Sequence, residues 1–164
     1  MPIWEYLMVL GMAAFLGGTL GMERELHGRW AGLRTHMMVS LGAAMFVHIG
    51  VETTESSPAD VSRIVQGVAA GIGFIGAGTI LKRTAELEVK GLTTASSIWL
   101  AAAIGSACGA HLYALASISA ALSLLVLFVL GKVQQYMNPT EDGSTEGTDG
   151  KKASVPSSSA NSDQ

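Results

Sequence analysis

The chain has 164 residues, which is enough for one ordinary domain. Only 14% of its residues are charged, and its mean hydropathy is +0.40. Because soluble domains carry roughly 25% charged residues, this composition excludes a typical soluble domain and predicts an integral membrane protein. The net charge of −3 indicates little about partners, since it includes an acidic tail, and no nucleic-acid partner is expected.

Five apolar segments are predicted to span the membrane, since about 20 residues cross the hydrocarbon core as a helix. They cover approximately residues 3–22, 36–51, 61–81, 92–107 and 112–131. The predicted fold class is an all-α integral membrane protein, a bundle of about five transmembrane helices with a disordered cytoplasmic tail. Residues 1–131 form the predicted transmembrane domain. Residues 132–164 form the tail, because they offer too little apolar surface to offset the entropy lost on ordering.

Glycine occurs five times in the third segment, whose single charge lies at its start. At about 100° per residue, three glycines share one face of a helix and two lie nearly opposite. The first face holds Gly67, Gly71 and Gly78, and the second holds Gly73 and Gly76. Small residues let helices approach closely in lipid, so this segment is predicted to be a central helix between two others. Gly17 and Gly21 form a similar packing face in the first segment.

The sequence Gly71-x-Gly73-x-x-Gly76 also matches the pattern of a dinucleotide-binding loop. That pattern requires a preceding strand and an acidic residue about 20 positions further on. Here the glycines lie within an unbroken apolar run, and Lys90 and Gly91 stand about 20 positions on. The nucleotide interpretation is therefore rejected, and no cofactor is expected.

Charged residues follow the first predicted span directly, beginning with Glu23-Arg24-Glu25. One interpretation is a solvated cytoplasmic loop that obeys the positive-inside rule. The other is a partly buried set of ion pairs, with residues 31–36 packed back against the bundle. Both stay open. A functional surface is predicted from Glu23, Arg24, Glu25, Arg29, Arg34, Thr35, His36, Thr93 and Thr94.

Thr93 and Thr94 belong to that surface because they open the fourth segment. Hydroxyl groups at a helix start usually cap it or bond to the preceding turn. The alternative is that the amides and hydroxyls there receive an anion or an acidic side chain.

Arg63 and Gln66 are polar residues at the outer end of the third segment. Arg63 is expected either to extend to the membrane interface or to pair with an acid such as Glu5. Gln66 is expected to bridge helices by hydrogen bonds. Asp60 is expected to be the N-cap of this helix.

Catalytic and metal-binding arrangements are not evident in the sequence. His48 has no second histidine, cysteine or carboxylate three or four positions away, so it is expected to be a hydrogen-bonded packing residue. The single cysteine, Cys108, offers no partner for a disulfide. No catalytic residue and no metal site are predicted, and the chain is not expected to be an enzyme.

Four motifs in order resemble the MgtC/SapB family of membrane proteins, between about Leu16 and Tyr113. They are Gly21-Met-Glu-Arg-Glu25, Ala31-Gly-Leu-Arg-Thr-His36, Gly71-Ile-Gly-Phe-Ile-Gly-Ala-Gly78, and Gly91-Leu-Thr-Thr-Ala95 through Trp99. Ser96 stands where that family usually has alanine.

The resemblance implies a bacterial inner-membrane regulatory protein associated with magnesium limitation and virulence. The partners it leaves open are another membrane protein, such as ATP synthase, and a second copy of the chain. Many family members carry a folded cytoplasmic domain after the last span, where this chain has a short polar tail. The alternative function is a subunit of a magnesium transporter or channel. The predicted spans contain no acid within their apolar cores, which disfavours a pore through one subunit.

Basic residues in the short connections predict the orientation of the chain. The first connection holds Arg24, Arg29 and Arg34, and the third holds Lys82, Arg83 and Lys90. The second and fourth connections contain none before Arg63, so the first and third are predicted to be cytoplasmic. The N-terminus is therefore expected outside and the C-terminus inside.

Compartment-sensitive reporters fused to the two ends of the chain would test this topology. We expect an N-terminal reporter to be active outside the membrane and a C-terminal reporter to be active in the cytoplasm. Two cytoplasmic ends would contradict the five-span prediction.

Overall fold

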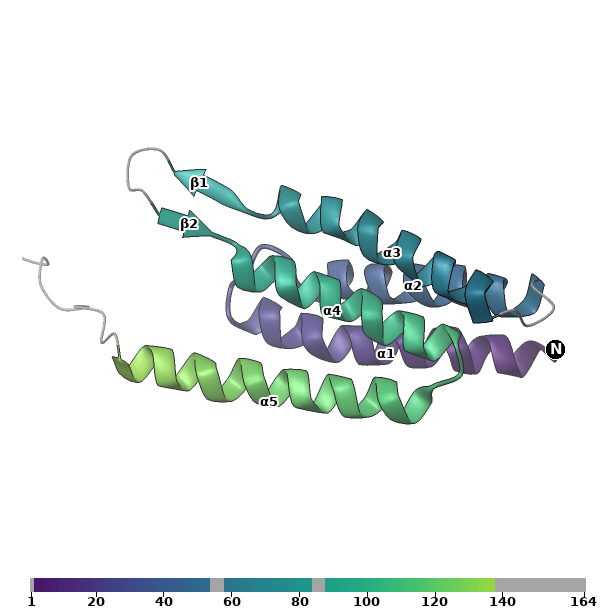
Figure 1. Ribbon diagram of the computed structural model, residues 1–164. Coiled ribbons are helices and arrows are strands. Elements are labelled where there is room, and N and C mark those ends of the chain that lie inside the picture. Colours follow the sequence, from purple (N-terminus) through teal and green to yellow (C-terminus); the bar gives the residue numbers. More distant parts are fainter. Residues whose placement is uncertain (1, 54–57, 84–87, 138–164) are drawn as a thin grey trace, which may run out of the picture.

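The computed structural model describes residues 2–53, 58–83 and 88–137, which form an elongated bundle of helices (Figure 1). The helices are α1 (Ile3–Leu26), α2 (Leu33–Thr53), α3 (Pro58–Gly78), α4 (Leu92–Gly109) and α5 (Tyr113–Met137). Between α3 and α4, β1 (Leu81–Arg83) and β2 (Glu88–Lys90) pair antiparallel, with Leu81 opposite Lys90. The predicted all-α bundle is confirmed, with this hairpin as an addition.

Four helices are long and apolar enough to cross a membrane, namely α1, α4, α3 from Ala59 and α5 to Val133. The fifth, α2, has 21 residues and is as long as α3, but Arg34, His36 and His48 make it more polar. The start of α1 and the end of α5 lie at opposite ends of the bundle (Figure 1). The chain is therefore a multi-pass membrane protein.

Helix boundaries differ from the predicted ones where polar residues continue a helix. The α1 helix runs through Glu23–Glu25 to Leu26, and α2 begins at Leu33. The α5 helix continues to Met137, so residues 132–137 are helical and do not belong to a disordered tail. Residues 138–164, for which disorder was predicted, lie outside the described residues. Asp60 lies in the first turn of α3 and is not its N-cap, because the helix already begins at Pro58.

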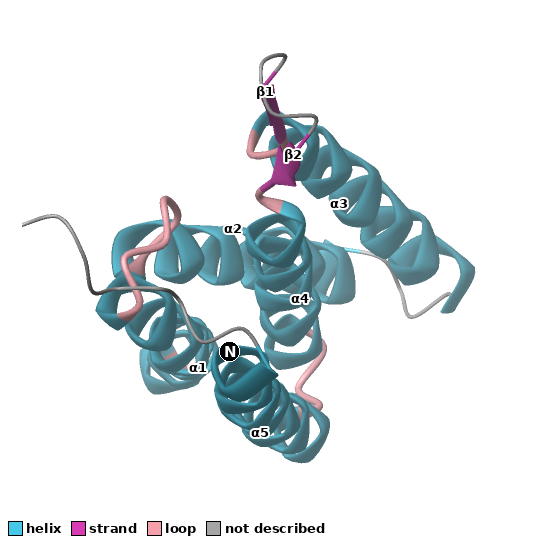
Figure 2. Cartoon of the chain, turned by 90° about the vertical axis from the view of Figure 1, so that its left-hand side faces the viewer, coloured by secondary structure: helices cyan, strands magenta, loops and turns pink. Residues whose placement is uncertain are grey.

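The central helix of the bundle is α4, which contacts each of the other four helices (Figure 2). Within the bundle, 61% of the α4 span is buried, against 6% of the α3 span. Its buried side chains Ile104 and Cys108 join an apolar core with Val9, Leu20 and Ala44. The prediction that the glycine-rich third segment is central is therefore wrong.

Close helix contacts occur at glycines outside α3. A Cβ atom on Gly105 would overlap the Ser40 carbonyl oxygen, and one on Gly109 would overlap the Ala44 carbonyl oxygen. A Cβ atom on Gly17 would lie 2.5 Å from Ser40 Cβ, and one on Gly21 would lie 2.7 Å from Leu33 Cα. These glycines let α2 fit closely between α1 and α4.

The glycines of α3 have few neighbours. Around Gly67, Gly71, Gly73 and Gly78, no atom of another described segment lies within 4 Å of a built Cβ. Gly76 alone meets α4, with Ala95 Cβ at an ordinary distance of 3.6 Å. A groove of about 570 Å³ separates α3 from α2, and Gly42, Gly67 and Gly71 are among its lining residues. Glycine spacing gives the smooth faces of a helix but does not determine which face has a neighbour, so the prediction fails here.

A matched pair of glycine substitutions would test this packing. We expect Gly105→Ala to lower the free energy of unfolding by about 1–3 kcal/mol, because the new methyl group would displace the Ser40 backbone. Gly67→Ala is the control, and it should be neutral or stabilising by about 0.5–1 kcal/mol, since alanine is the better helix former. Denaturation in detergent micelles measures both. Equal destabilisation by the two variants would contradict the placement of α3 at the edge.

Candidate functional site

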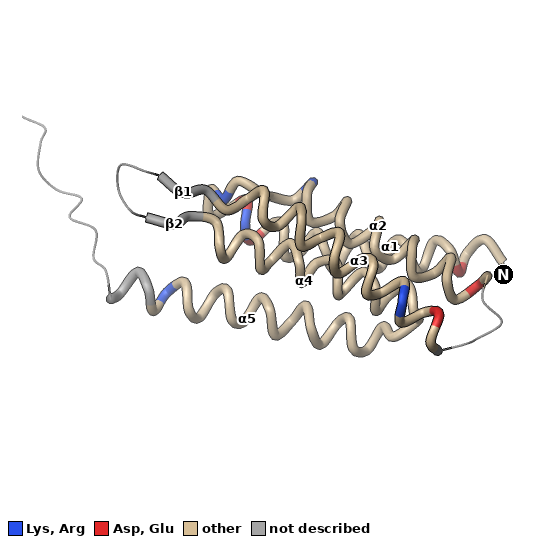
Figure 3. Tube along the Cα trace, turned by 45° about the horizontal axis from the view of Figure 1, so that its top comes forward, with Lys and Arg blue, Asp and Glu red and all other residues tan. Residues whose placement is uncertain are grey.

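The predicted functional surface gathers at one end of the bundle, where α1 ends and both α2 and α4 begin (Figure 3). Its residues differ in exposure. Exposed side chains belong to Glu25, Arg29, Arg34 and Thr93, intermediate ones to Glu23 and Thr35, and buried ones to Arg24, His36 and Thr94. We call these nine residues the end surface. The structure thus brings together three sequence segments that were assigned to one surface.

Glu25 fastens the end of α1 to the start of α2. Its Oε2 accepts a hydrogen bond of 2.8 Å from the backbone N–H of Leu33, the first residue of α2. A carboxylate at this point satisfies a free amide and opposes the positive end of the helix dipole. The chain reverses at Gly28, whose φ of 62° lies in the left-handed region, and Ala31 is buried. Ala31 and His36 are buried while Arg34 is exposed, so residues 31–36 pack against the bundle only in part, as the second interpretation of this connection expected, and Arg34 is not drawn into it.

His36 joins α2 to α4. Its Nδ1 donates to the Gly32 carbonyl oxygen at 2.9 Å, because a carbonyl oxygen can only accept. Its Nε2 lies 3.0 Å from the hydroxyl group of Ser97, which is buried on α4. In the neutral ring Nε2 can only accept, so it shares the single Ser97 hydroxyl proton with the Thr94 carbonyl oxygen, which lies 2.9 Å from the same hydroxyl. The bond fixes the first turn of α2 at the level of Ser97.

Arg24 is buried on α1, with 4% of its surface exposed. Its Nη1 lies 3.4 Å from Glu23 Oε2, and Glu23 Oε1 lies 3.1 Å from Nδ1 of His27. Within the described residues, the Nε and Nη2 atoms of Arg24 are buried and have no hydrogen-bond partner. A guanidinium group in this state carries an unusual desolvation cost.

The start of α4 depends on Gly91. Its φ is 101°, and a Cβ atom there would overlap the carbonyl oxygen of Thr79. Gly91 is the N-cap of α4 and provides no side-chain cap. Thr93 and Thr94 follow within the first turn and are not in the capping position. The hydroxyls of Ser96 and Ser97 bond back to the Leu92 and Thr94 carbonyl oxygens, as expected for hydroxyls near a helix start.

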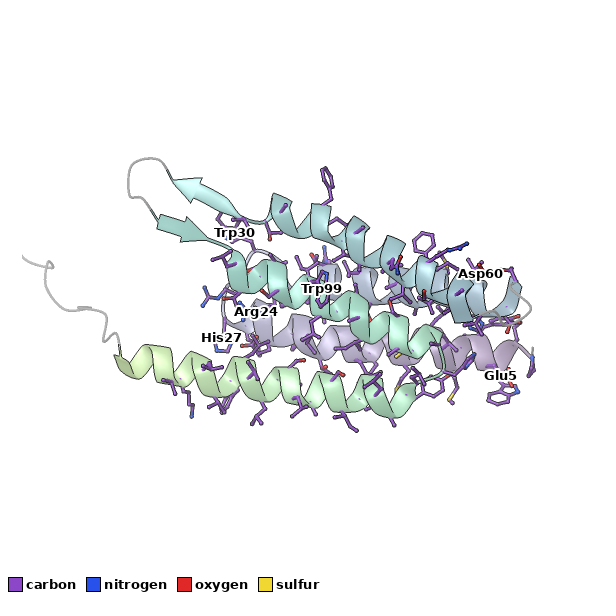
Figure 4. The ribbon with its side chains drawn as sticks, in the orientation of Figure 1. Glu5, Arg24, His27, Trp30, Asp60 and Trp99 are labelled. Atoms are coloured by element: carbon purple, nitrogen blue, oxygen red, sulfur yellow. The ribbon has the colours of Figure 1, made fainter. Side chains whose placement is uncertain are left out.

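Arg63 and Gln66 lie near the start of α3, and Figure 4 labels Asp60 of that helix at the end of the bundle opposite Arg24. The Arg63 side chain is 78% exposed and pairs with Asp60 at 3.6 Å. It is thus not in a buried pair with Glu5. Gln66 is exposed and makes no interhelical hydrogen bond within the part of the chain that the structure describes, so its predicted bridging role is not found.

A cluster of histidine and tyrosine rings was missed by the sequence analysis. His48 on α2 lies 5.2 Å from His111 and 5.4 Å from Tyr6 between ring centroids. His111 Nδ1 lies 3.1 Å from the Tyr113 hydroxyl, while both nitrogens of His48 lack partners among the described residues. His48 is therefore not the hydrogen-bonded packing residue that was expected. His111 belongs to the turn between α4 and α5, beyond the reach of a search at helical spacing. The described residues contain no group of three side chains suited to a metal.

Replacing Glu25 would test its capping role. We expect Glu25→Ala to lower the free energy of unfolding by about 0.5–2 kcal/mol, because the Leu33 amide loses its acceptor. The neighbouring exposed residue Arg29 gives the control, and Arg29→Ala should change stability by less than about 0.5 kcal/mol. Denaturation in detergent measures both variants. An unchanged midpoint for Glu25→Ala would contradict the cap.

Comparison with known proteins places the chain in a family. The family model described as the MgtC family matches residues 10–136. An "Uncharacterized protein slr0014" of Synechocystis is 41% identical over 143 residues, covering 87% of this chain and 59% of that protein. "Putative magnesium transporter YhiD" of Escherichia coli K12 is 41% identical over 131 residues, covering 76% of this chain and 60% of that protein.

A third relative, MgtC of Salmonella typhimurium, is 36% identical over 138 residues, which cover 84% of this chain. The chain spans about three fifths of the length of these relatives, from 58% to 60%. No solved structure gives a significant match. The resemblance drawn from the four motifs is confirmed, and the chain is a membrane protein that belongs to the MgtC family.

Proposed function

We propose that the chain is a non-enzymatic regulatory membrane protein that binds another membrane protein through the end surface. The observation that carries this proposal is that some residues of the end surface join the helices, while others point away from the bundle. Glu25 and His36 hold three helix ends together, while Arg29, Arg34 and Thr93 project outward. Trp30, 76% exposed beside them, adds an aromatic group of the kind enriched in protein interfaces.

The proposed setting is the bacterial inner membrane, with the end surface in the cytoplasm. The basic residues of the first connection support this orientation through the positive-inside rule. Membership of the MgtC family supports a role in adaptation to low magnesium and, in a pathogen, in virulence. The first partner to test is ATP synthase, which the family resemblance implies, and a second copy of the chain is the next.

A magnesium transporter or channel subunit is the second candidate, favoured by the name of the Escherichia coli relative. Magnesium prefers oxygen ligands, commonly carboxylates and water. The buried polar residues among those described are arginine, histidine, serine and threonine, with no buried acid. This composition disfavours a cation path through a single copy.

Affinity purification from membranes would test the regulatory proposal. We expect Arg34→Ala to reduce recovery of the partner at least threefold, because an exposed charge at the contact is lost, and to impair growth at low magnesium. Arg63→Ala is the matched control at the opposite end and should leave recovery unchanged. Equal recovery and equal growth for Arg34→Ala and the unmodified protein would count against the end surface.

Magnesium flux into reconstituted vesicles separates the two candidates. The regulatory proposal expects no saturable flux above that of protein-free vesicles. Saturable flux from the purified chain alone would reverse the ranking.

A further inference from the structure

The side-on edge of the Arg24 guanidinium group has no hydrogen-bond partner among the described residues. Nε and Nη2 form the edge that binds carboxylate or phosphate groups with two parallel hydrogen bonds. Both atoms are buried and unpartnered among the described residues, while Nη1 is directed to Glu23. Arg24 is held in place by its helix and by its burial, so this edge is preorganised.

The first turn of α4 lies at the same end of the bundle as Arg24 (Figure 4). A Cβ atom on Gly21 would lie 3.0 Å from His36 Cβ, and His36 in turn bonds Ser97 of α4. Arg24 follows Gly21 by three residues, and so lies on the same side of α1 nearly one turn closer to its end. Thr94 precedes Ser97 by three residues, nearly one turn closer to the start of α4. Figure 4 shows Arg24 at the end of the bundle where α4 begins.

The two helix starts at this end differ in how their positive ends are neutralised. The first amide of α2 donates a hydrogen bond to the Glu25 carboxylate, whereas α4 starts at Gly91 with no side-chain cap. Amides in the first turn of a helix form a ready site for an anion. A buried guanidinium edge that has no partner among the described residues and an uncapped helix start thus lie at the same end of the bundle (Figure 4), and both favour negative charge.

We infer that Arg24 and the first turn of α4 bind a phosphate-type oxyanion, with Thr93 and Thr94 as supporting hydroxyl groups. The oxyanion would accept two hydrogen bonds from Nε and Nη2 of Arg24 and further ones from the α4 amides. Two sources share this chemistry, namely the headgroup of an anionic lipid and free inorganic phosphate. This site shares Thr93 with the end surface, but it depends on Arg24, whereas the proposed partner contact depends on Arg34, so the two can fail separately.

Thermal unfolding of the full chain in neutral detergent micelles tests the site, because a ligand of the folded state raises the midpoint. Potassium phosphate is compared with potassium chloride at equal ionic strength. In a second arm, micelles containing phosphatidylglycerol are compared with micelles containing phosphatidylcholine. We expect a rise of about 3–5 °C in at least one arm. A rise with phosphate identifies the free ion as sufficient, and a rise with phosphatidylglycerol alone identifies the lipid headgroup.

Arg24→Gln should reduce that rise to less than about 1 °C, while Arg63→Gln at the opposite end should keep it in full. Arg24→Lys retains the charge without the two-pronged edge and should lose most of the rise, so it decides the matter if Arg24→Gln fails to fold. Arg34→Ala should leave the rise intact even where it abolishes partner recovery.

Three results would overturn the inference. The first is no rise in the unmodified protein in either arm. The second is an equal rise in the unmodified protein and the Arg24 variants. The third is an equal rise with potassium acetate, which would assign the edge to a carboxylate such as an acidic side chain of a partner protein.

Discussion

The structure depends on the close approach of α2 to α4, which glycine makes possible at Gly105 and Gly109. In lipid, apolar side chains gain little by leaving one hydrocarbon environment for another, so helices associate through van der Waals packing at small residues. Any side chain at these two positions would meet the carbonyl groups of Ser40 and Ala44. The contact fixes α4 in the centre, and α1, α3 and α5 take their places around it.

This central contact also determines the geometry of the end surface. Because α2 and α4 are held against each other along their length, their first turns lie at the same end of the bundle. The His36–Ser97 hydrogen bond then fixes their relative height, and Glu25 adds the end of α1 through the Leu33 amide. Three chain segments far apart in the sequence are thereby joined by two polar contacts. Charges on this surface project from a rigid base, which is the arrangement that recognition requires.

The sequence predicted the positions of the helices better than it predicted which helices pack against each other. Apolar runs of about 16 to 21 residues placed the helices, since length and hydropathy are local properties. The glycines of α3 misled the prediction, because a smooth helix face is necessary for close packing but does not ensure a partner. The His48–His111 contact was out of reach, and the burial of Arg24 could only be one of two open interpretations, since each depends on how separate helices meet. The residues of the end surface could be singled out because its charges interrupt the apolar pattern, and the structure gathers them at one end of the bundle.

Buried polar side chains differ in whether they have hydrogen-bond partners, and the difference depends on their position along the bundle. In the middle of the bundle, Ser40 donates to the Ala13 carbonyl oxygen and Ser123 to that of Ser119, so these hydroxyls are satisfied. Buried polar side-chain atoms without partners, among the described residues, belong to Arg24, His48 and His111. Arg24 lies in the last turn of α1, and His111 lies in the turn between α4 and α5. Leaving such a group unpaired costs about 1–3 kcal/mol, and more when it is charged. The hydroxyl groups in the middle of the bundle are thus satisfied, whereas the buried polar atoms that lack partners among the described residues lie towards its ends.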